Sequence, residues 1–127
     1  MVKKELFDKC VGLLEESGLG ENAFCEVTWV FEDVADGEDI TPEQEKRISD
    51  IVTRRCEGYP LQYLLGQWEF YGLPFKVGEG VLIPRQDTET IVDTALKMFA
   101  GKKDITVIDL CSGSGCIGIT LERKLDC

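Results

Sequence analysis

The sequence has 127 residues, of which 43% are hydrophobic and 30% are charged, a composition that is typical of a globular domain and excludes a disordered or fibrous chain. Its net charge of −10 argues against nucleic acid as a direct partner, because phosphate binding requires a surplus of lysine and arginine. The longest uncharged stretch, residues 110–121, is too short to cross a bilayer, so we expect a soluble cytoplasmic protein without a membrane anchor or secretory signal.

The first 66 residues have the hydrophobic spacing of short helices. Apolar side chains recur three and four residues apart in residues 2–14 and 24–34, which predicts two amphipathic helices. Thr41 and Gln44 form a capping-box pattern with Pro42 at the first helical position, and the helix that follows should end at Gly58. We therefore predict a small helical bundle over residues 1–66. The side chains expected to face its interior are Val2, Leu6, Cys10, Leu13, Leu14, Phe24, Val27, Phe31, Val34, Ile48, Ile51 and Val52.

Residues 67–83 change to the alternation that is typical of strands. Two short apolar-polar runs flank a turn predicted at Gly72-Leu73-Pro74, which together indicate a β-hairpin linker. Residues 81–83 are a third candidate strand. Residues 84–88 should then lead into a helix that ends at Gly101. The side chains expected on its buried face are Ile91, Val92, Ala95, Leu96 and Phe99.

The last segment has the pattern strand, glycine loop, helix. Residues 105–108 are apolar and β-branched, as in a strand inside a parallel sheet, and residues 109–115 form the loop before an amphipathic helix. This is the first unit of an open, Rossmann-like α/β fold, in which a ligand binds at the carboxyl end of the strand. A lone parallel strand leaves its backbone edges unpaired, so we expect residues 105–108 to be covered by self-association or to be poorly ordered.

The glycine loop offers a choice between two cofactors. Gly113, Gly115 and Gly118 match the G-x-G-x-x-G fingerprint of dinucleotide-binding proteins, although a tight strand-to-helix turn alone would give the same pattern. Asp109 argues against a dinucleotide, because two anions a few ångströms apart repel by ~1 kcal/mol even in water. S-adenosylmethionine has no phosphate, carries a sulfonium and an ammonium cation, and can turn its carboxylate to the helix N-terminus. The loop therefore favours S-adenosylmethionine, with an NAD-dependent oxidoreductase as a lesser alternative.

Two residue types limit the chemistry further. The chain has no histidine, which excludes imidazole general bases, Ser-His and Cys-His dyads and histidine metal ligands. Its six cysteines include no C-x-x-C pair, so we expect neither a metal site nor a disulfide framework. The thiols should be reduced, mostly buried, and packed as small apolar groups.

Four blocks of sequence follow one another between residues 55 and 121. They are residues 55–66 (RCEGYPLQYLLG), 70–77 (FYGLPFKV), 81–89 (VLIPRQDTE) and 107–117 (VIDLCSGSGCI). Together they resemble the HemK-type protein-(glutamine-N5) methyltransferases. The resemblance implies an enzyme of translation termination that transfers a methyl group from S-adenosylmethionine to the glutamine amide of the Gly-Gly-Gln motif in peptide chain release factors. It also implies that the helical front helps to dock the release factor.

The resemblance implies a cofactor role for residues in two of these blocks. Cys111 stands where many family members have glycine, and its side chain should narrow the loop slightly. Residues 84–89 resemble the segment that closes over cofactor and substrate, with a helix N-cap as the alternative role for this segment. No catalytic residue and no metal ligand are predicted. The predicted cofactor-binding residues are Arg85, Thr88, Asp109, Cys111, Ser112, Gly113, Ser114 and Gly115.

The family's catalytic motif, Asn-Pro-Pro-Tyr, does not occur in these 127 residues. In the family, its asparagine side chain and a proline carbonyl hold the substrate amide in line with the methyl group. Here the only asparagine is Asn22, and no proline follows another. We therefore expect a front portion without activity of its own: a helical substrate-docking domain at 1–66, a hairpin linker at 67–83, and the start of an S-adenosylmethionine-binding domain at 84–127.

The uneven charge leaves a second interpretation open. Residues 1–50 hold 5 basic and 14 acidic side chains, whereas residues 51–127 hold 9 and 10. An acidic front suits a basic protein surface, so a non-catalytic acidic helical protein-binding module is the alternative function. Acidity that only keeps the protein soluble is equally compatible with this pattern.

Overall fold

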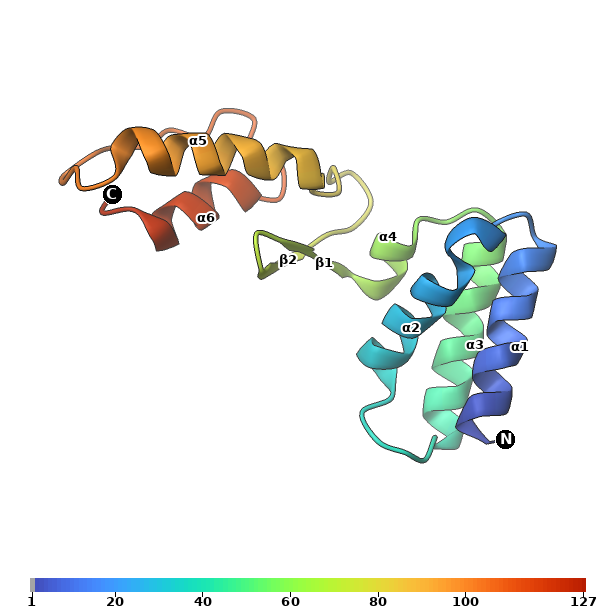
Figure 1. Cartoon of the computed structure of the whole chain (residues 1–127). Helices are drawn as coiled ribbons and strands as arrows, with labels where there is room; N and C mark the ends of the chain where they lie inside the picture. Colours follow the sequence, from blue (N-terminus) through green and yellow to red (C-terminus); the bar gives the residue numbers. More distant parts are fainter. Residues whose placement is uncertain (1) are drawn as a thin grey trace. The chain divides into compact units, whose positions relative to one another are not determined.

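The computed structural model describes residues 2–127, and internal contacts divide the chain between Leu65 and Gly66 into two compact units. The first, here called the helical unit, contains α1 (Lys3–Glu16), the 3₁₀ turn η1 (Gly20–Asn22), α2 (Ala23–Val34), α3 (Pro42–Cys56) and α4 (Leu61–Leu65). The second, the mixed unit, contains β1 (Gln67–Phe70), β2 (Leu73–Lys76), the 3₁₀ turn η2 (Gln86–Thr88), α5 (Glu89–Phe99) and α6 (Cys116–Lys124) (Figure 1). The predicted boundaries after residues 66 and 83 stay predictions.

In the helical unit, α1, α2 and α3 pack alongside one another around one continuous core (Figure 1). Most of the predicted interior is confirmed. Val2, Leu13 and Phe24 are exceptions, because they are exposed at the flanks of their helices. On α1 the buried stripe runs through every fourth residue from Leu6 to Leu14, and on α2 Ala23 takes the inward position beside Phe24. The buried core residues are Leu6, Cys10, Leu14, Ala23, Val27, Val30, Phe31, Ala35, Ile48, Ile51, Val52 and Leu61.

The predicted capping box begins α3. The backbone N–H of Gln44 donates to Thr41 Oγ1 at 3.2 Å, and the N–H of Thr41 donates to Gln44 Oε1 at 3.0 Å. The side-chain Nε2 of Gln44 also donates to the carbonyl of Val34, 3.1 Å away at the end of α2. One amide therefore joins the start of α3 to the end of α2. Beyond Cys56 the chain turns at Gly58, whose φ of +101° lies in the region that favours glycine.

An ion pair between α2 and α3 gives the first residue of the 55–66 block a structural role. Arg55 Nε donates to Glu26 Oε2 at 2.8 Å and Nη2 donates to Oε1 at 3.2 Å, so the pair is bidentate. The hydrogen bond to Glu26 raises the pKa of Arg55 above its ordinary value. Arg55 Nη1 also donates to the carbonyl of Tyr59 at 3.3 Å, which ties the turn after α3 to the helix.

The hairpin of the mixed unit has a tighter turn than predicted. Phe70 pairs with Leu73, so the connection is the two residues Tyr71 and Gly72, with φ of 53° and 76°. Positive φ at both positions is typical of a type I′ turn, whose twist matches that of the strands. Leu73 and Pro74, predicted as part of the turn, therefore belong to β2.

Two contacts of Tyr71 attach this turn to α5. Its backbone N–H donates to Glu89 Oε1 at 2.7 Å, and its hydroxyl donates to Asp93 Oδ1 at 2.5 Å. The hydrogen bond to Asp93 raises the pKa of the Tyr71 hydroxyl. Glu89 and Asp93 lie one turn apart on α5 and so present both carboxylates on one face. Beneath the hairpin, Phe70 and Phe75 meet edge to face with ring centroids 6.2 Å apart.

The core of the mixed unit is small. α5 packs against α6, and the buried cluster consists of Phe70, Phe75, Val92, Cys116 and Leu121. The helix predicted after residue 88 is confirmed, but Ile91 is exposed while Val92 takes the buried position. Only Val92 of the predicted face is fully buried, because the unit offers α5 few partners.

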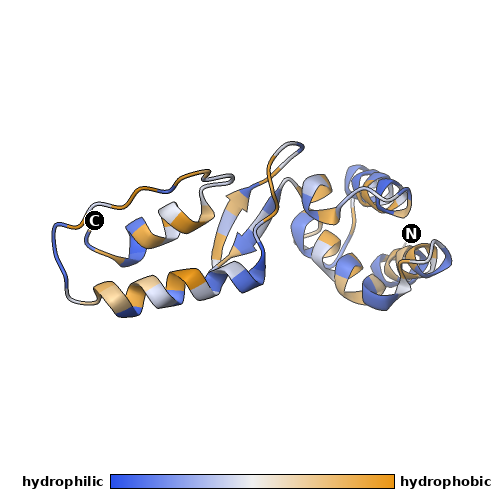
Figure 2. Cartoon of the chain, turned by 90° about the horizontal axis from the view of Figure 1, so that it is seen from above, coloured by the Kyte–Doolittle hydropathy of each residue, from blue (hydrophilic) through white to orange (hydrophobic). Residues whose placement is uncertain are grey.

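Two predicted strands are not formed. Among residues 2–127 the only sheet is the antiparallel pair β1–β2, and both residues 81–83 and residues 105–108 are irregular. Ile108 is 78% exposed, although its segment was predicted to be buried in a parallel sheet. A strand requires a neighbour for its backbone groups, and no other strand of the described residues lies beside these segments. Figure 2 shows apolar residues in the coil before α6. The predicted self-association through this segment stays a prediction.

Candidate functional site

The predicted cofactor loop, residues 109–115, leads directly into α6. Three of its residues have left-handed backbone: Cys111 with φ 56°, Gly113 with φ 58° and Gly115 with φ 82°. Glycine adopts this conformation without strain, whereas a side chain is disfavoured by ~1–2 kcal/mol. Cys111 therefore occupies a position whose geometry favours glycine.

A hydrogen bond to the side chain of Asp109 connects this loop to α6. Asp109 Oδ2 accepts a hydrogen bond of 3.0 Å from the backbone N–H of Gly118, in the first turn of α6. The carboxylate thus satisfies one of the helix N–H groups that have no intrahelical acceptor, as an N-terminal cap does. A Cβ atom added at Gly118 would lie 2.9 Å from the same oxygen, closer than real contacts allow. The third glycine of the fingerprint therefore permits the approach of Asp109.

The loop presents polar groups to solvent at a helix N-terminus. Ser112 and Gly113 are exposed, Ser114 and Gly115 are half-buried, and the N–H of Gly115 donates to the carbonyl of Ser112 at 2.9 Å. Helix geometry leaves the N–H groups of the first residues of α6 without an intrahelical acceptor. Such a terminus can hold a carboxylate or another anion.

The structure does not bring all predicted cofactor residues together. Arg85 is exposed and Thr88 is half-buried, and both belong to the turn before α5, where the N–H of Thr88 donates to the carbonyl of Arg85 at 3.1 Å. Within residues 2–127 no hydrogen bond or ion pair links either side chain to the loop 109–115. Thr88 also makes no side-chain cap on α5, so the alternative role as an N-cap is not formed either.

All six cysteines are free thiols, but the prediction that they are mostly buried is wrong. Cys10 and Cys116 are buried, Cys56 is half-buried, and Cys25, Cys111 and Cys127 are exposed. In the part of the chain that the structure describes, no group of three or more potential ligands could hold a metal ion. None of the described helices combines the length and the apolar character needed to span a membrane.

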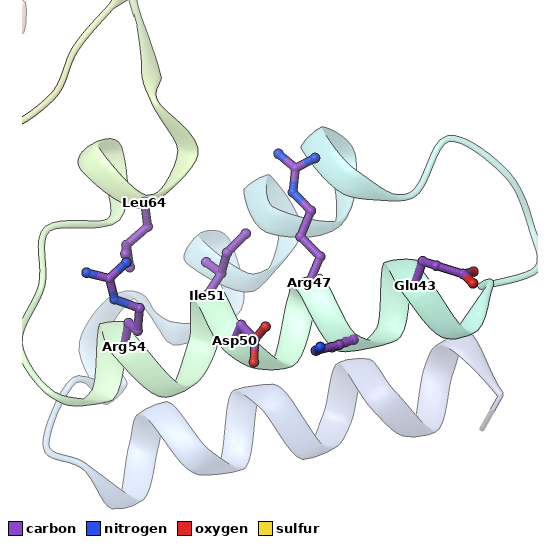
Figure 3. Close-up of a pocket in the computed structure, with 7 residues that line it drawn as sticks. Glu43, Arg47, Asp50, Ile51, Arg54 and Leu64 are labelled. Carbon is purple, nitrogen blue, oxygen red and sulfur yellow. The ribbon is translucent and has the colours of Figure 1, made fainter.

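A concave surface that the sequence motifs did not indicate lies on the helical unit. This groove between α3 and α4 has a volume of about 300 Å³, and Figure 3 shows Leu64 of α4 pointing toward Arg54 on α3. Arg47 Nη2 lies 3.2 Å from Asp33 Oδ2, and the Arg54 guanidinium carbon lies 4.5 Å from the centroid of the Tyr59 ring. The signal in the sequence is the alternation of charge at four-residue spacing along α3. The groove is lined by Glu43, Lys46, Arg47, Asp50, Ile51, Arg54 and Leu64.

Known proteins are similar to this chain over both units. Residues 5–66 match the family described as the PrmC N-terminal domain. A release factor glutamine methyltransferase of Fusobacterium nucleatum is 36% identical over 132 residues, covering 95% of this chain and 37% of its own length. The enzyme of the same name from Geobacter sulfurreducens is 38% identical over 133 residues, covering 96% of this chain and 45% of its own length. That of Moorella thermoacetica is 43% identical over 88 residues, covering 69% of this chain and 31% of its own length. The chain therefore spans less than half the length of these curated relatives.

Proposed function

We propose that this chain, in which residues 5–66 match the PrmC N-terminal domain family and which is similar over 95% of its length to a release factor glutamine methyltransferase, supplies the docking and cofactor-binding parts of such an enzyme. The reaction is the N5-methylation, in the cytoplasm, of the glutamine of the Gly-Gly-Gln motif in a peptide chain release factor. The observation that carries this proposal is similarity that runs through both units, over 95% of the chain, and includes the loop 109–115.

The loop is proposed to hold S-adenosylmethionine, which supplies an electrophilic methyl group when bound. Its residues fit that molecule in two respects. The N-terminus of α6 can receive the carboxylate of the methionine part. Asp109 has one oxygen engaged by Gly118 and the other remaining for the cationic ammonium or sulfonium group. A diphosphate in the same place would face this carboxylate across a short distance and be repelled. Cys111, Ser112, Gly113, Ser114 and Gly115 are the proposed contacts, with Arg85 and Thr88 as proposed additions from the turn before α5.

Titration calorimetry with S-adenosylhomocysteine and with NAD tests the cofactor. We expect the 127-residue polypeptide to bind S-adenosylhomocysteine in preference to NAD. Asp109→Asn retains an oxygen that accepts from Gly118 but removes the charge, so it should weaken binding of the sulfonium compound S-adenosylmethionine by about fivefold, corresponding to about 1 kcal/mol of electrostatic attraction. Asp126→Asn, at an exposed position, is the matched control. The assignment would be contradicted if the polypeptide bound NAD in preference to S-adenosylhomocysteine. It would also be contradicted if Asp109→Asn bound S-adenosylmethionine as tightly as the unaltered polypeptide does.

The 127 residues alone are proposed not to transfer the methyl group. An amide nitrogen is a weak nucleophile, so hydrogen-bonding groups must hold it in line with the methyl group. The family's motif for this task does not occur here, and the only asparagine, Asn22, lies in the short turn η1 of the helical unit. Incubation with a release factor and labelled S-adenosylmethionine should leave the factor unlabelled. Label on the Gly-Gly-Gln glutamine would contradict this.

The helical unit is proposed to dock the release factor. One observation also favours the second candidate function, an acidic binding module without catalysis: the helical unit closes its own core, so its surface does not depend on the mixed unit to be formed. Surface-immobilised release factor distinguishes the two. Binding together with S-adenosylhomocysteine affinity supports the methyltransferase part, whereas binding to a basic protein without any cofactor affinity supports the module.

A further inference from the structure

A groove of about 550 Å³ lies between the start of α1 and the last turns of α2. Its lining is mostly apolar. Phe7 and the buried Phe31 are among the lining side chains, together with Val2 and Ala35, while Thr28 and Glu32 on α2 add polar groups. This groove is distinct from the charged one between α3 and α4 in Figure 3, with which it shares no lining residue.

The apolar surface continues beyond the groove through Phe24. The ring of Phe7 meets Phe31 and Phe24 edge to face, with centroid distances of 5.2 Å and 5.3 Å. Phe24 is 66% exposed and lies one turn before Thr28, whose Oγ1 donates to the carbonyl of Phe24. Aromatic side chains normally bury most of their surface, and those left in water at a concave surface are common anchors for a partner.

A strongly acidic segment lies at one end of the groove. Residues 32–39 contain five carboxylates and neither lysine nor arginine. Glu32 lines the groove itself, and Lys3 Nζ donates to the carbonyl of Gly37, so the loop after α2 lies against the start of α1. Asp36, Glu38 and Asp39 in this loop are exposed. Lys3 and Lys4 also line the groove, but the surrounding carboxylates outnumber them.

The two grooves therefore select different partners. The groove between α3 and α4 is lined by three cationic side chains and two carboxylates, Glu43 and Asp50, so a basic segment meets a surplus of like charge there. At the groove between α1 and α2, the same segment would meet exposed carboxylates beside an apolar surface. Complementary charge of this kind steers association and fixes which face a partner contacts.

We propose that the groove between α1 and α2 docks a basic protein segment that places an apolar side chain against Phe7 and Phe24 and its cationic side chains beside residues 32–39. This inference rests on the proposed docking role of the helical unit and assigns that role to one face of it. The partner is recognised by two properties at once, an apolar anchor and positive charge, because neither the aromatic surface nor the acidic loop alone distinguishes it from other proteins.

Three short synthetic peptides test the proposal by nuclear magnetic resonance titration of the ¹⁵N-labelled 127-residue polypeptide. The first is a helical peptide with leucine and phenylalanine on one face and lysine on the other. The second replaces each lysine by glutamate, and the third replaces the apolar residues by serine. We expect the first peptide to shift the amide resonances of Phe7, Thr28 and Glu32 and not those of Lys46 or Asp50. The second peptide should not bind, and the third should bind about tenfold more weakly.

Matched variants locate the site. Glu32→Lys should weaken binding of the first peptide by about fivefold to tenfold, because the reversed charge repels several lysines of the peptide. Glu43→Lys, in the other groove, should change the affinity for this peptide by less than about twofold. Phe24→Ala should weaken it by about tenfold, whereas Leu13→Ala, another exposed apolar residue on a helix, should not. Circular dichroism confirms that each variant stays folded.

Four outcomes overturn the proposal: no binding of the first peptide, equal binding of its glutamate twin, resonance shifts centred on the groove between α3 and α4, or concentration-dependent shifts at Phe24 without peptide, which would make a second copy of the chain the occupant. The experiment uses neither release factor nor cofactor. A failure of the proposed methyltransferase function would therefore leave the peptide result standing, and the reverse also holds.

Discussion

The helical unit builds a larger buried core from its own residues than the mixed unit does. Among residues 2–127, twelve buried residues form one cluster in the helical unit, compared with five in the mixed unit, where Leu82, Ile91, Met98, Ile108 and Leu110 are exposed. The two units are of similar length, so size does not explain the difference. Helices satisfy their backbone groups locally and need only an apolar stripe to pack, but strands need neighbours that come from elsewhere in the chain. Local elements therefore complete one unit and leave the other open.

The prediction with the largest expected effect compares an isoleucine-to-alanine substitution in each of the two units. Ile48→Ala, at a fully buried position in α3, should lower the free energy of unfolding of the helical unit by about 3 kcal/mol, because it leaves a cavity in a closed core. Ile91→Ala, at an exposed position in α5, should change the mixed unit by less than about 0.5 kcal/mol. Each unit contains one tryptophan, so urea unfolding of Trp68→Phe and Trp29→Phe backgrounds reports the two units separately. Equal losses at the two positions would contradict the comparison.

The second test is the pH dependence of the helical unit. Burial raises the pKa of the Cys10 thiol from 9.0 to about 11. Because the folded pKa lies above the unfolded one, the stabilisation is fully present below pH 9 and is lost as the pH rises to about 11, by about 2–3 kcal/mol in all. Cys10→Ala should remove this part of the pH dependence of urea unfolding, whereas Cys25→Ala, at an exposed thiol, should retain it. An unchanged profile in Cys10→Ala would show that this thiol is not protected from ionisation.

The third test concerns the buried side of the mixed unit. Thr120 on α6 is fully buried, and its hydroxyl oxygen has no hydrogen-bond partner among the described residues. Thr120→Val replaces the hydroxyl by a methyl group of similar size and should stabilise the mixed unit by about 1 kcal/mol, since no polar group then remains buried without a partner. Thr90→Val, at an exposed position on α5, serves as the control. Urea unfolding followed by Trp68 fluorescence measures both, and destabilisation by Thr120→Val would indicate an acceptor for this hydroxyl in solution.

The smallest expected effect is at the loop. Cys111→Gly should stabilise the mixed unit by about 0.5 kcal/mol, because the relief of left-handed strain slightly exceeds the additional backbone entropy of glycine. Cys111→Ala retains a Cβ atom and should give no gain. The comparison of the two in thermal unfolding separates backbone strain from any loss of the thiol, and a gain in both variants would assign the effect to the thiol.

The sequence was sufficient for the parts of the fold that depend on neighbours along the chain. Thr41 and Gln44 predicted the start of α3, and the spacing of Leu6, Cys10 and Leu14 predicted the inward face of α1. Single positions at the flanks failed, as at Phe24, because spacing defines a broad stripe and not its edges. The β-branched composition of residues 105–108 indicated a strand correctly by propensity, but a ladder requires a partner that composition does not supply.

The candidate site could be predicted in part for the same reason. The three glycines predicted the position of the loop and its helix, because the left-handed backbone at Gly113 and Gly115 favours glycine and glycine is visible in the sequence. The hydrogen bond from Gly118 to Asp109 was not foreseen, although the glycine at that position was its signal. The sequence also grouped Arg85 and Thr88 with the loop through resemblance alone, and no spacing rule relates two segments that are separated by a whole helix.

The side chain of Gln44 has a consequence for engineering. Its amide accepts from Thr41 and donates to Val34, so the two ends of the acidic connection between α2 and α3 are fastened by a residue that lies outside it. The interior of that connection can therefore be lengthened at an entropic penalty of only about 0.6 kcal/mol for each doubling of its length. A short epitope inserted after Gly37 would leave both helices in place, and an antibody bound to it would cover the acidic residues proposed to contact the basic segment.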